Sequence, residues 1–314
     1  MMSAVATSRS RAKERPGDRV FSTATIVAGG LILAVLAAVA VFLFIQSIPA
    51  FSAEPQDFKG DFTNFWSYVW PLAFGTLWSA ALALLMAIPL AIGIALFISH
   101  YAPRRLAQGL GYIVDLLAAV PSVVFGLWGI GVLAPMIQPF YTTLVEWFGW
   151  FPLFSGPVSG TGRTVLTVAI VLAVMVLPII TAICREVFLQ TPVLHEEAAL
   201  ALGATRWEMI QMAVLPFGRP GIISAAMLGL GRALGETMAV ALILSPSPQV
   251  IFQLLTSQNP STIAANIALN FPEAHGVGVN ILLATGLVLF VITLAVNMLA
   301  RYIIDRRKAF SGAN

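Results

Sequence analysis

Long apolar runs alternate with shorter polar segments along this chain. Six of the runs are long enough to cross a membrane as helices, and they cover residues 21–46, 71–98, 107–135, 164–184, 218–244 and 279–300. A helix needs about 20 apolar residues to span the roughly 30 Å hydrocarbon core of a bilayer. The pattern therefore predicts an all-α, polytopic membrane protein with six transmembrane helices.

The composition excludes the other broad classes of protein. Of 314 residues, 59% are apolar and only 10% are charged, and the mean hydropathy is +0.90. Soluble domains carry about 25% charged residues, and disordered chains are richer still in polar groups. Cys184 is the only cysteine, and His100, His195 and His275 are far apart in the sequence. We expect no disulfide within the chain, no metal site and no catalytic residues.

Lysine and arginine are distributed unevenly between the loops. They gather in residues 1–20, 99–106, 185–219 and 301–314, whereas the loops 47–70, 136–162 and 245–278 hold only Lys59. Cytoplasmic loops of membrane proteins carry the excess of basic residues. The distribution predicts six spans with both termini in the cytoplasm.

The first apolar run, residues 21–46, is interpreted as an uncleaved span. A basic arm precedes it, as in a signal peptide, but the apolar part of a signal peptide is only about 7–15 residues long. We divide the chain into a cytoplasmic arm (1–20), a six-helix transmembrane domain (21–300, with its core at 70–300) and a cytoplasmic tail (301–314).

The outer loops carry two further patterns. Residues 145–154 hold Trp147, Trp150, Phe151 and Phe154, which favours a band at the membrane interface. The loop 245–278 is rich in turn-forming residues, and its middle, 261–269, predicts a short amphipathic helix. These loops are either solvated connectors or a docking surface for a soluble partner.

The longest polar stretch on the basic side, residues 185–216, predicts a helical hairpin. Thr191 is a candidate N-cap for its first helix, and Gly203 is expected to end that helix in a left-handed conformation. Thr205-x-x-Glu208 is a capping-box pattern that starts a second helix. The sequence therefore predicts a compact helical knob projecting from the membrane.

Two charged residues, Arg232 and Glu236, lie inside the fifth apolar run. A charge at the bilayer centre costs about 2.5–3.5 kcal/mol on insertion scales, and such residues usually face a bundle interior or an aqueous route. In a continuous helix the two side chains share a face, so they form either a structural ion pair or part of a substrate route. The guanidinium suits an oxyanion. The carboxylate could accept a hydrogen bond from the proton of monohydrogen phosphate, which sulfate lacks at neutral pH. Gly229, Gly231 and Gly235 either permit close packing or leave room beside an ion.

The third apolar run contains Pro121, which removes a backbone donor and is expected to kink the helix. Interrupted helices often line a transporter's pathway, and Ser122 could offer a hydroxyl there. The alternative is a kinked packing helix whose freed carbonyl is satisfied by neighbours. Asp115 lies nearer the cytoplasmic end and is interpreted as an acid that faces a partner or a cavity.

The polar hairpin carries a recognisable spacing. Glu197-Ala198-Ala199, then Gly203, then Ala213-Val214-Leu215-Pro216 resembles the EAA signature of ABC importer permeases. In that family the loop is the coupling helix, which enters a cleft on the nucleotide-binding subunit. The resemblance implies a type I ABC importer permease fold and a coupling role for Glu196, Glu197, Ala198 and Gly203. A connector without a partner is the alternative.

A second resemblance, which with the EAA loop covers about residues 70–300, is more specific. The string from Gly231 to Val240 and the Pro-Ser segment from Leu116 to Gly126 are similar to segments of the PstC family, the permeases of phosphate ABC importers. This resemblance implies ATP-driven phosphate import across the bacterial inner membrane. It also implies a substrate pathway with Arg232, Glu236, Thr237 and Ser122. The expected partners are a second, PstA-like permease, a dimer of a PstB-like ATPase, a PstS-like extracytoplasmic phosphate-binding protein and membrane lipid.

The chain has no ATP-binding motif of its own. A Walker A motif ends in Gly-Lys-Ser/Thr, but Lys13, Lys59 and Lys308 are followed by Glu, Gly and Ala. We therefore expect a transport subunit that is not an enzyme and holds no cofactor, with ATP and magnesium bound by the partner ATPase. The alternatives are a permease for sulfate or molybdate, an ATP-independent channel or secondary transporter, and a purely structural assembly subunit.

Overall fold

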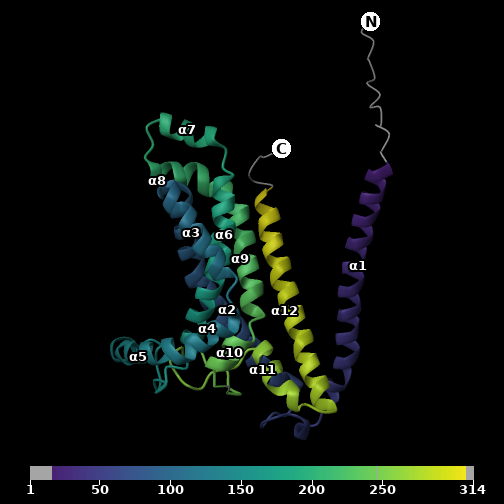
Figure 1. Cartoon of the computed structure of the whole chain (residues 1–314). Coiled ribbons are helices and arrows are strands. Elements are labelled where there is room, and N and C mark those ends of the chain that lie inside the picture. The colour runs from purple at the N-terminus through teal and green to yellow at the C-terminus, as the bar shows by residue number, and fades with distance from the viewer. Residues whose placement is uncertain (1–15, 246, 309–314) are drawn as a thin grey trace.

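The computed structural model describes residues 16–245 and 247–308, and the regular secondary structure in this part is helical (Figure 1). The long helices are α1 (Pro16–Ser47), α2 (Phe65–Leu96), α6 (Val165–Leu189), α9 (Leu215–Leu234) and α12 (Val277–Lys308). The shorter helices are α3 (Arg104–Ala118), α4 (Ser122–Trp128), α5 (Ala134–Phe148), α7 (Val193–Ala201), α8 (Arg206–Met209), α10 (Met238–Ile243) and α11 (Ile263–Asn270). Turns of 3-10 geometry cover Ile48–Ser52, Pro55–Asp57 and Phe271–Glu273, and π turns cover Phe97–Tyr101, Gly129–Leu133 and Ile210–Val214.

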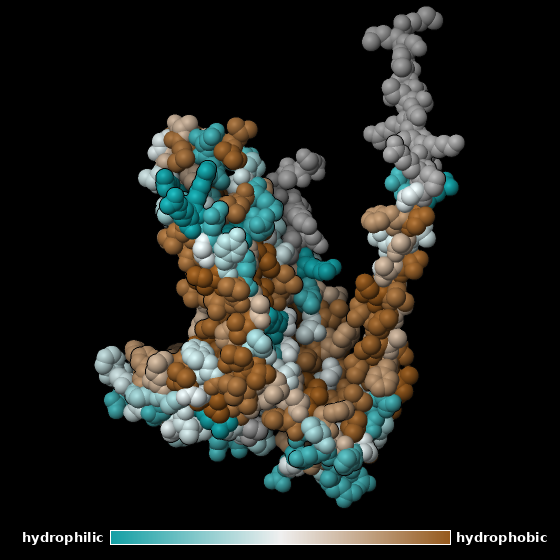
Figure 2. All heavy atoms as spheres, viewed as in Figure 1, coloured by the Kyte–Doolittle hydropathy of each residue, from teal (hydrophilic) through white to brown (hydrophobic). Residues whose placement is uncertain are grey.

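The long helices run between two polar ends of the molecule. One end, which we call the hairpin end, holds α7 and α8 together with the first turns of α1 and the last turns of α12 (Figure 1). The opposite end, which we call the loop end, holds α11. Apolar side chains cover the surface between the two ends, and polar side chains gather at the ends themselves (Figure 2). This distribution is the one expected of a protein that crosses a bilayer.

Six segments of the described chain are long and apolar enough to cross a membrane. They are Gly17–Ser52, Phe65–Tyr101, Ser122–Phe148, Val165–Leu189, Arg206–Leu234 and Val277–Tyr302. The predicted all-α fold with six apolar helices is therefore confirmed. The first, second, fourth and sixth segments include most of the predicted runs, whereas the third and fifth differ.

The third predicted span, 107–135, is not one helix. α3 ends at Ala118 and α4 begins at Ser122, so the chain is interrupted at Pro121 rather than kinked. Proline has no N–H group and disfavours helical geometry in the residue before it, which explains the interruption. The apolar segment instead begins at Ser122, and Figure 1 shows its last part, α5, lying across the direction of the long helices.

The fifth predicted span, 218–244, also has different limits. The π turn Ile210–Val214 joins α8 directly to α9, so the second arm of the hairpin continues into the membrane. α9 then ends at Leu234, and the chain is not helical again until α10 begins at Met238. A glycine at the C-cap, Gly235, favours this end because glycine has a low helix propensity.

The core lies where α2, α6 and α9 pack together. Alanines at every third or fourth position of α2 are buried there, namely Ala80, Ala83, Ala87, Ala91 and Ala95. This spacing places them on one face of the helix, and small side chains allow membrane helices to approach closely. α6 is the most enclosed of the six apolar segments, because 61% of its apolar window is buried.

α1 stands apart from this core (Figure 1). Its apolar window is 0% buried. It contacts α12 near the loop end, where the side-chain amide of Asn280 donates a 2.7 Å hydrogen bond to the carbonyl oxygen of Gln46. An apolar helix this exposed must be covered by lipid or by another protein.

The outer segment 247–278 is packed against the helices and is not simply a solvated connector. The short helix expected over 261–269 is confirmed as α11, whose first residue, Ile263, is fully buried. The N–H of Ile263 donates to the hydroxyl of Thr76 on α2 at 2.9 Å. The loop therefore supplies part of the protein core at the loop end.

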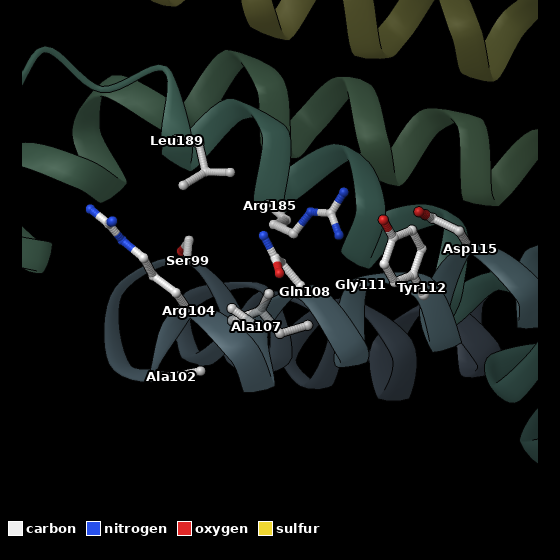
Figure 3. A pocket seen from close by; sticks show the side chains of 11 residues that line it. Ser99, Ala102, Arg104, Ala107, Gln108, Gly111, Tyr112, Asp115, Arg185 and Leu189 are labelled. Carbon is white, nitrogen blue, oxygen red and sulfur yellow. The ribbon is translucent and has the colours of Figure 1, made fainter.

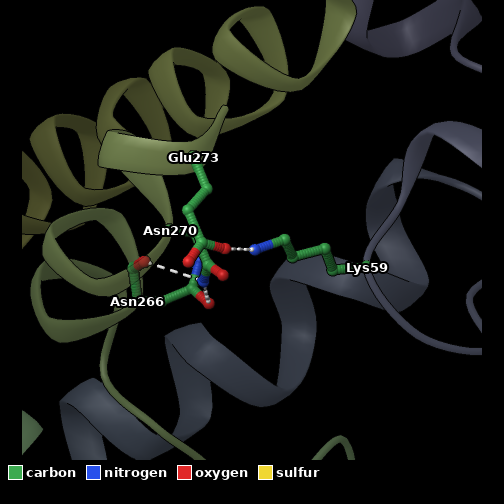
Figure 4. Close-up of polar contacts among 4 residues, drawn as sticks. All are labelled: Lys59, Asn266, Asn270 and Glu273. Carbon is green, nitrogen blue, oxygen red and sulfur yellow. Dashed lines mark hydrogen bonds and ion pairs between the residues drawn. The ribbon is translucent and has the colours of Figure 1, made fainter. Parts of the chain in front are cut away.

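An ion pair lies on the surface of the loop end (Figure 4). The ammonium of Lys59 lies 2.7 Å from a carboxylate oxygen of Glu273, and the amide of Asn270 donates to the side-chain oxygen of Asn266 nearby at 2.9 Å. The hydrogen bond and the charge of Lys59 lower the pKa of the Glu273 carboxyl group. The stabilisation is therefore present above the usual pKa of a glutamate and is lost as the pH falls through the lowered value. It is small because both side chains are exposed.

Gly75 on α2 marks the closest approach of the outer loop. A Cβ atom there would collide with the carbonyl oxygens of Ser261 and Pro260, whereas a Cβ at Gly93, on the same helix, would meet nothing within 4 Å. The loop can reach its hydrogen bond with Thr76 only because residue 75 has no side chain.

Gly75→Ala should therefore lower the stability of the protein by about 1–3 kcal/mol, since the added methyl group displaces packed backbone. Gly93→Ala is the matched control and should be neutral or stabilising by about 0.5–1 kcal/mol, because alanine is the better helix former. Thermal unfolding of both variants in detergent, followed by circular dichroism, checks this difference. Equal melting temperatures would contradict the close packing at Gly75.

Candidate transport pathway and coupling hairpin

The break between α9 and α10 holds three of the four predicted pathway residues. Arg232 lies in the last turn of α9, and Glu236 and Thr237 form the link before α10. Glu236 is 7% exposed, whereas Arg232 and Thr237 are partly exposed. Because α9 ends at Leu234, Arg232 and Glu236 do not occupy successive turns of one helix.

The short helix α10 is stabilised at both ends by charged side chains. Oε1 of Glu236 accepts a 3.0 Å hydrogen bond from the N–H of Ala239 in the first turn. At the other end, the guanidinium of Arg163 donates to the carbonyl oxygens of Ile243 (2.9 Å) and Leu242 (3.2 Å). Helix ends expose unpaired donors and acceptors with partial charges, so an acid at the first turn and a base at the last are both favourable.

Arg232 has no hydrogen bond or ion pair with any other side chain or backbone group in residues 16–245 and 247–308. Of the two alternatives expected for Arg232 and Glu236, the structural ion pair is therefore absent from the described chain, because the Glu236 carboxylate binds the backbone of α10 instead. A cation at the C-terminus of α9 is favourable by about 0.3–1 kcal/mol. That interaction leaves the guanidinium donors free for a ligand.

Ser122, the fourth predicted pathway residue, begins α4 and is partly exposed. α4 packs against α10 with Gly126 opposite Ala239 and Gly129 opposite Ile243, so the two helices run in the same direction. A Cβ on Gly126 would lie only 2.8 Å from the Cα of Ala239. Since Ser122 lies one turn before Gly126, this register brings it near the level of the link that precedes α10.

The three glycines of this region divide between the two expected roles. A Cβ on Gly229 would lie 2.7 Å from the Ile180 side chain of α6, so Gly229 serves helix packing. A Cβ on Gly231 would meet nothing within 4 Å, and one on Gly235 would meet only a backbone oxygen at 3.5 Å. Those two glycines leave open space beside Arg232.

The hairpin at the opposite end has the predicted form. Gly203 follows α7 with a φ of +87°, in the left-handed region that glycine adopts without strain. The capping box is present: the N–H of Glu208 donates to the Thr205 hydroxyl at 3.3 Å, and the N–H of Thr205 donates to the Glu208 carboxylate at 2.7 Å. Thr191 is not the N-cap of α7; Pro192 holds that position, and the Thr191 hydroxyl is buried without a partner in the described chain.

The surface of the hairpin combines acidic and apolar groups. Glu197 and Ala198 are exposed, whereas Ala199 is partly buried against the core. Leu194 and Leu202 are 76% and 90% exposed. Apolar side chains at a polar end of a membrane protein indicate a surface that another protein covers.

A polar contact joins the hairpin to α2. Nε2 of His100 lies 3.5 Å from a carboxylate oxygen of Glu196 on α7. The other ring nitrogen of His100 lies 2.6 Å from the Ser99 hydroxyl, which donates to the carbonyl oxygen of Ala95 at 2.8 Å. A displacement of α7 would therefore act on the end of α2 through Glu196 and His100.

Sequence reasoning missed Arg163 and His100. The one available signal for Arg163 was that it lies next to an outer loop that otherwise lacks basic residues. The helix that it caps could not be recognised, because α10 is hidden inside a continuous apolar run. His100 gave no signal, since its partner is far along the chain.

Comparison with known proteins assigns the chain. The sequence model of the family described as "binding-protein-dependent transport system inner membrane component" matches residues 87–309, which include the hairpin and the α9–α10 break. The chain belongs to this family. It is accordingly a multi-pass inner-membrane protein of the ABC importer permease class.

Several phosphate transport permeases are similar to this chain in sequence. The "phosphate transport system permease protein PstC 2" of Mycobacterium tuberculosis is 46% identical over 302 residues and covers 92% of both chains. The PstC permease of Mycobacterium leprae is 45% identical, over 91% of this chain and 92% of its own. That of Mesorhizobium japonicum is 39% identical, over 94% of this chain and 92% of its own.

Solved structures share the fold at lower identity. A bacterial ABC transporter that imports alginate matches with a TM-score of 0.56 at 20% identity, over 92% of this chain and 99% of its own. The MetNI methionine ABC transporter matches with a TM-score of 0.52 at 18% identity, over 76% of this chain and 93% of its own. The predicted type I ABC importer permease fold is confirmed.

Glu236→Ala should lower the stability of the protein by about 0.5–2 kcal/mol, because it removes the oxygen that caps α10. Glu236→Gln keeps an oxygen acceptor and should retain most of that stability. Glu146→Ala, which removes an exposed acid from α5, is the control and should have no effect. Thermal unfolding of the three purified variants tests the cap, and an equal loss in Glu236→Gln and Glu236→Ala would argue against it.

Proposed function

We propose that this chain is the permease subunit of an ATP-driven importer of inorganic phosphate and forms the transmembrane pathway together with a second permease. The relatives that carry the name of phosphate transport permease are 39–46% identical to it and match it over nearly its whole length. Such a match includes both the hairpin and the break between α9 and α10.

The unpaired guanidinium of Arg232 is the main support for a substrate pathway at this break. An arginine at the end of an apolar membrane helix is costly unless it faces protein or water, and its guanidinium has no partner in the described chain. A planar guanidinium binds an oxyanion through two parallel hydrogen bonds. The open space at Gly231 and Gly235 gives a small anion access to it.

Glu236 has a second role in this proposal. Its Oε1 caps α10, which fixes the side chain, while its other oxygen accepts no hydrogen bond from the described chain. That oxygen accepts a hydrogen bond from the O–H group of monohydrogen phosphate. Sulfate has no such proton at neutral pH, so the same carboxylate repels it. Thr237 and Ser122 supply hydroxyl groups near the same level.

The hairpin couples the pathway to an ATPase. Glu196, Glu197, Ala198 and Gly203 form the surface that docks on a PstB-like ATPase dimer, with Leu194 and Leu202 as apolar anchors. ATP and magnesium bind to that partner, because this chain carries no Walker A sequence. ATP shifts the balance between outward- and inward-facing states only through its different affinity for the two states.

The remaining partners follow from the orientation. With the basic segments inside, both termini and the hairpin end lie in the cytoplasm, and the loop end faces outward. A PstS-like phosphate-binding protein docks at the loop end. A PstA-like permease and lipid cover the exposed apolar surface, including α1.

Uptake of labelled phosphate by cells that lack this chain tests both parts of the mechanism. The wild type should restore phosphate uptake but not sulfate uptake. Glu197→Arg, which reverses a charge on the docking surface, and Arg232→Ala, which removes the anion ligand, should each reduce uptake at least about tenfold. Sulfate uptake by the wild type would overturn the substrate assignment, and normal transport by both variants would favour a channel or an assembly role.

Glu236→Gln should reduce the preference for phosphate over sulfate, because a neutral amide no longer repels sulfate. Competition of unlabelled sulfate against labelled phosphate uptake measures this preference. Thr237→Ser, which keeps the hydroxyl, is the control. An unchanged preference in Glu236→Gln would exclude the carboxylate as the acceptor of the phosphate proton.

A further inference from the structure

A cavity of about 510 Å³ opens between α3 and α6 at the hairpin end, away from the α9–α10 break (Figure 3). Its polar lining includes Arg104, Gln108, Tyr112 and Asp115 of α3 and Arg185 of α6. The four α3 residues are spaced by three or four positions, so they form one polar face of that helix. A polar face of this kind is unusual next to an apolar bundle and indicates a ligand or an aqueous route.

Arg185 is held in an unusual position. Its guanidinium lies against α3 at Gly111, in space that a Cβ of residue 111 would otherwise occupy. Its Nε is buried and has no hydrogen-bond partner in the described chain. Figure 3 shows the guanidinium directed into the cavity. Arg185 as a whole is partly exposed, but a buried N–H group without an acceptor is costly, and an anion in the cavity would remove that cost.

We propose that this cavity binds a phosphate group that carries an ionisable proton, either inorganic phosphate or the monoester headgroup of phosphatidic acid. Arg185 donates hydrogen bonds to its oxygens. The Arg104 guanidinium lies at the other end of the lining and points away from Arg185 (Figure 3). Asp115, which has no ion-pair partner in the described chain, accepts a hydrogen bond from the O–H group of the phosphate. Sulfate and phosphodiester headgroups lack that proton, so the Asp115 carboxylate repels them.

The cavity and the α9–α10 break are two separate binding sites for phosphate. Arg232 lies in the last turn of α9, whereas Arg185 lies near the hairpin end of α6. On the orientation proposed above, the Arg185 site faces the cytoplasm, where imported phosphate is released. The cytoplasmic placement rests on the proposed function, but the binding chemistry of the cavity does not.

Equilibrium binding of labelled orthophosphate tests this site. The probe is added to the complete complex purified from its host membrane in phosphatidylcholine nanodiscs, without ATP or binding protein. All complexes carry Arg232→Ala, which removes the α9 site. Addition of Arg185→Gln should weaken phosphate binding at least about tenfold, because it removes charged hydrogen bonds. Arg219→Gln, an exposed arginine outside the cavity, is the control and should change the affinity less than about twofold.

Asp115→Asn gives a second measurement if Arg185→Gln fails to fold. It changes an exposed side chain and should let sulfate compete with phosphate. If neutral nanodiscs bind no phosphate, native mass spectrometry of nanodiscs containing phosphatidic acid should detect that lipid in Arg219→Gln but not in Arg185→Gln. That result assigns the site to the lipid.

The proposal is overturned if neither phosphate nor phosphatidic acid binding depends on Arg185 and Asp115→Asn leaves sulfate excluded. Phosphate transport by the wild-type complex is measured alongside. If the wild-type complex transports phosphate normally but binding does not depend on Arg185, only this second site is contradicted. If binding depends on Arg185 but the wild-type complex does not transport phosphate, only the proposed function is contradicted.

Discussion

Inside a bilayer, each backbone N–H and C=O group needs a hydrogen-bond partner within the protein, because no water is present. The breaks in the helices of this protein depend on how that requirement is met. The chain interrupts its helices before α4 and again before α10. The two short helices pack on each other through Gly126, and Glu236 and Arg163 bind the open ends of α10. The charged residues Glu236 and Arg163, which are unusual near an apolar segment, therefore satisfy the backbone groups that the break exposes. The break also leaves Arg232 free to bind an anion.

The same break is mechanically connected to the hairpin. From the capping box at Thr205 to Leu234, α8, a π turn and α9 form one uninterrupted helical rod. On the proposed function, a displacement of α8, the second arm of the hairpin, moves Arg232 at the far end of that rod. A second connection passes from Glu196 through His100 into α2. Because α2, α6 and α9 share one packed core, a rigid-body motion is the natural response to a force on the hairpin.

Sequence reasoning predicted what repeats or obeys a local rule. The six apolar helices, the left-handed Gly203 and the Thr205 capping box each depend on residues close together in the chain, and they were predicted correctly. Sequence reasoning failed where contacts between distant segments determine the local structure. An apolar run has the same composition whether it is one helix or is interrupted. The end of α9 was therefore missed, and Arg232 and Glu236 were expected on one face of a continuous helix. The hydrogen bonds of Arg163 and the position of Arg185 depend on distant segments and left no local pattern.

On the proposed function, phosphate passes the break between α9 and α10. Gly235→Cys, in a chain whose only other cysteine is changed by Cys184→Ala, places a thiol in open space beside Arg232. A charged thiol reagent should modify it in the assembled complex, and phosphate but not sulfate should slow the reaction. Gly29→Cys, on exposed and apolar α1, should stay unmodified within lipid or a subunit contact. A thiol at residue 235 that does not react, or reacts at a rate independent of phosphate, would contradict the account.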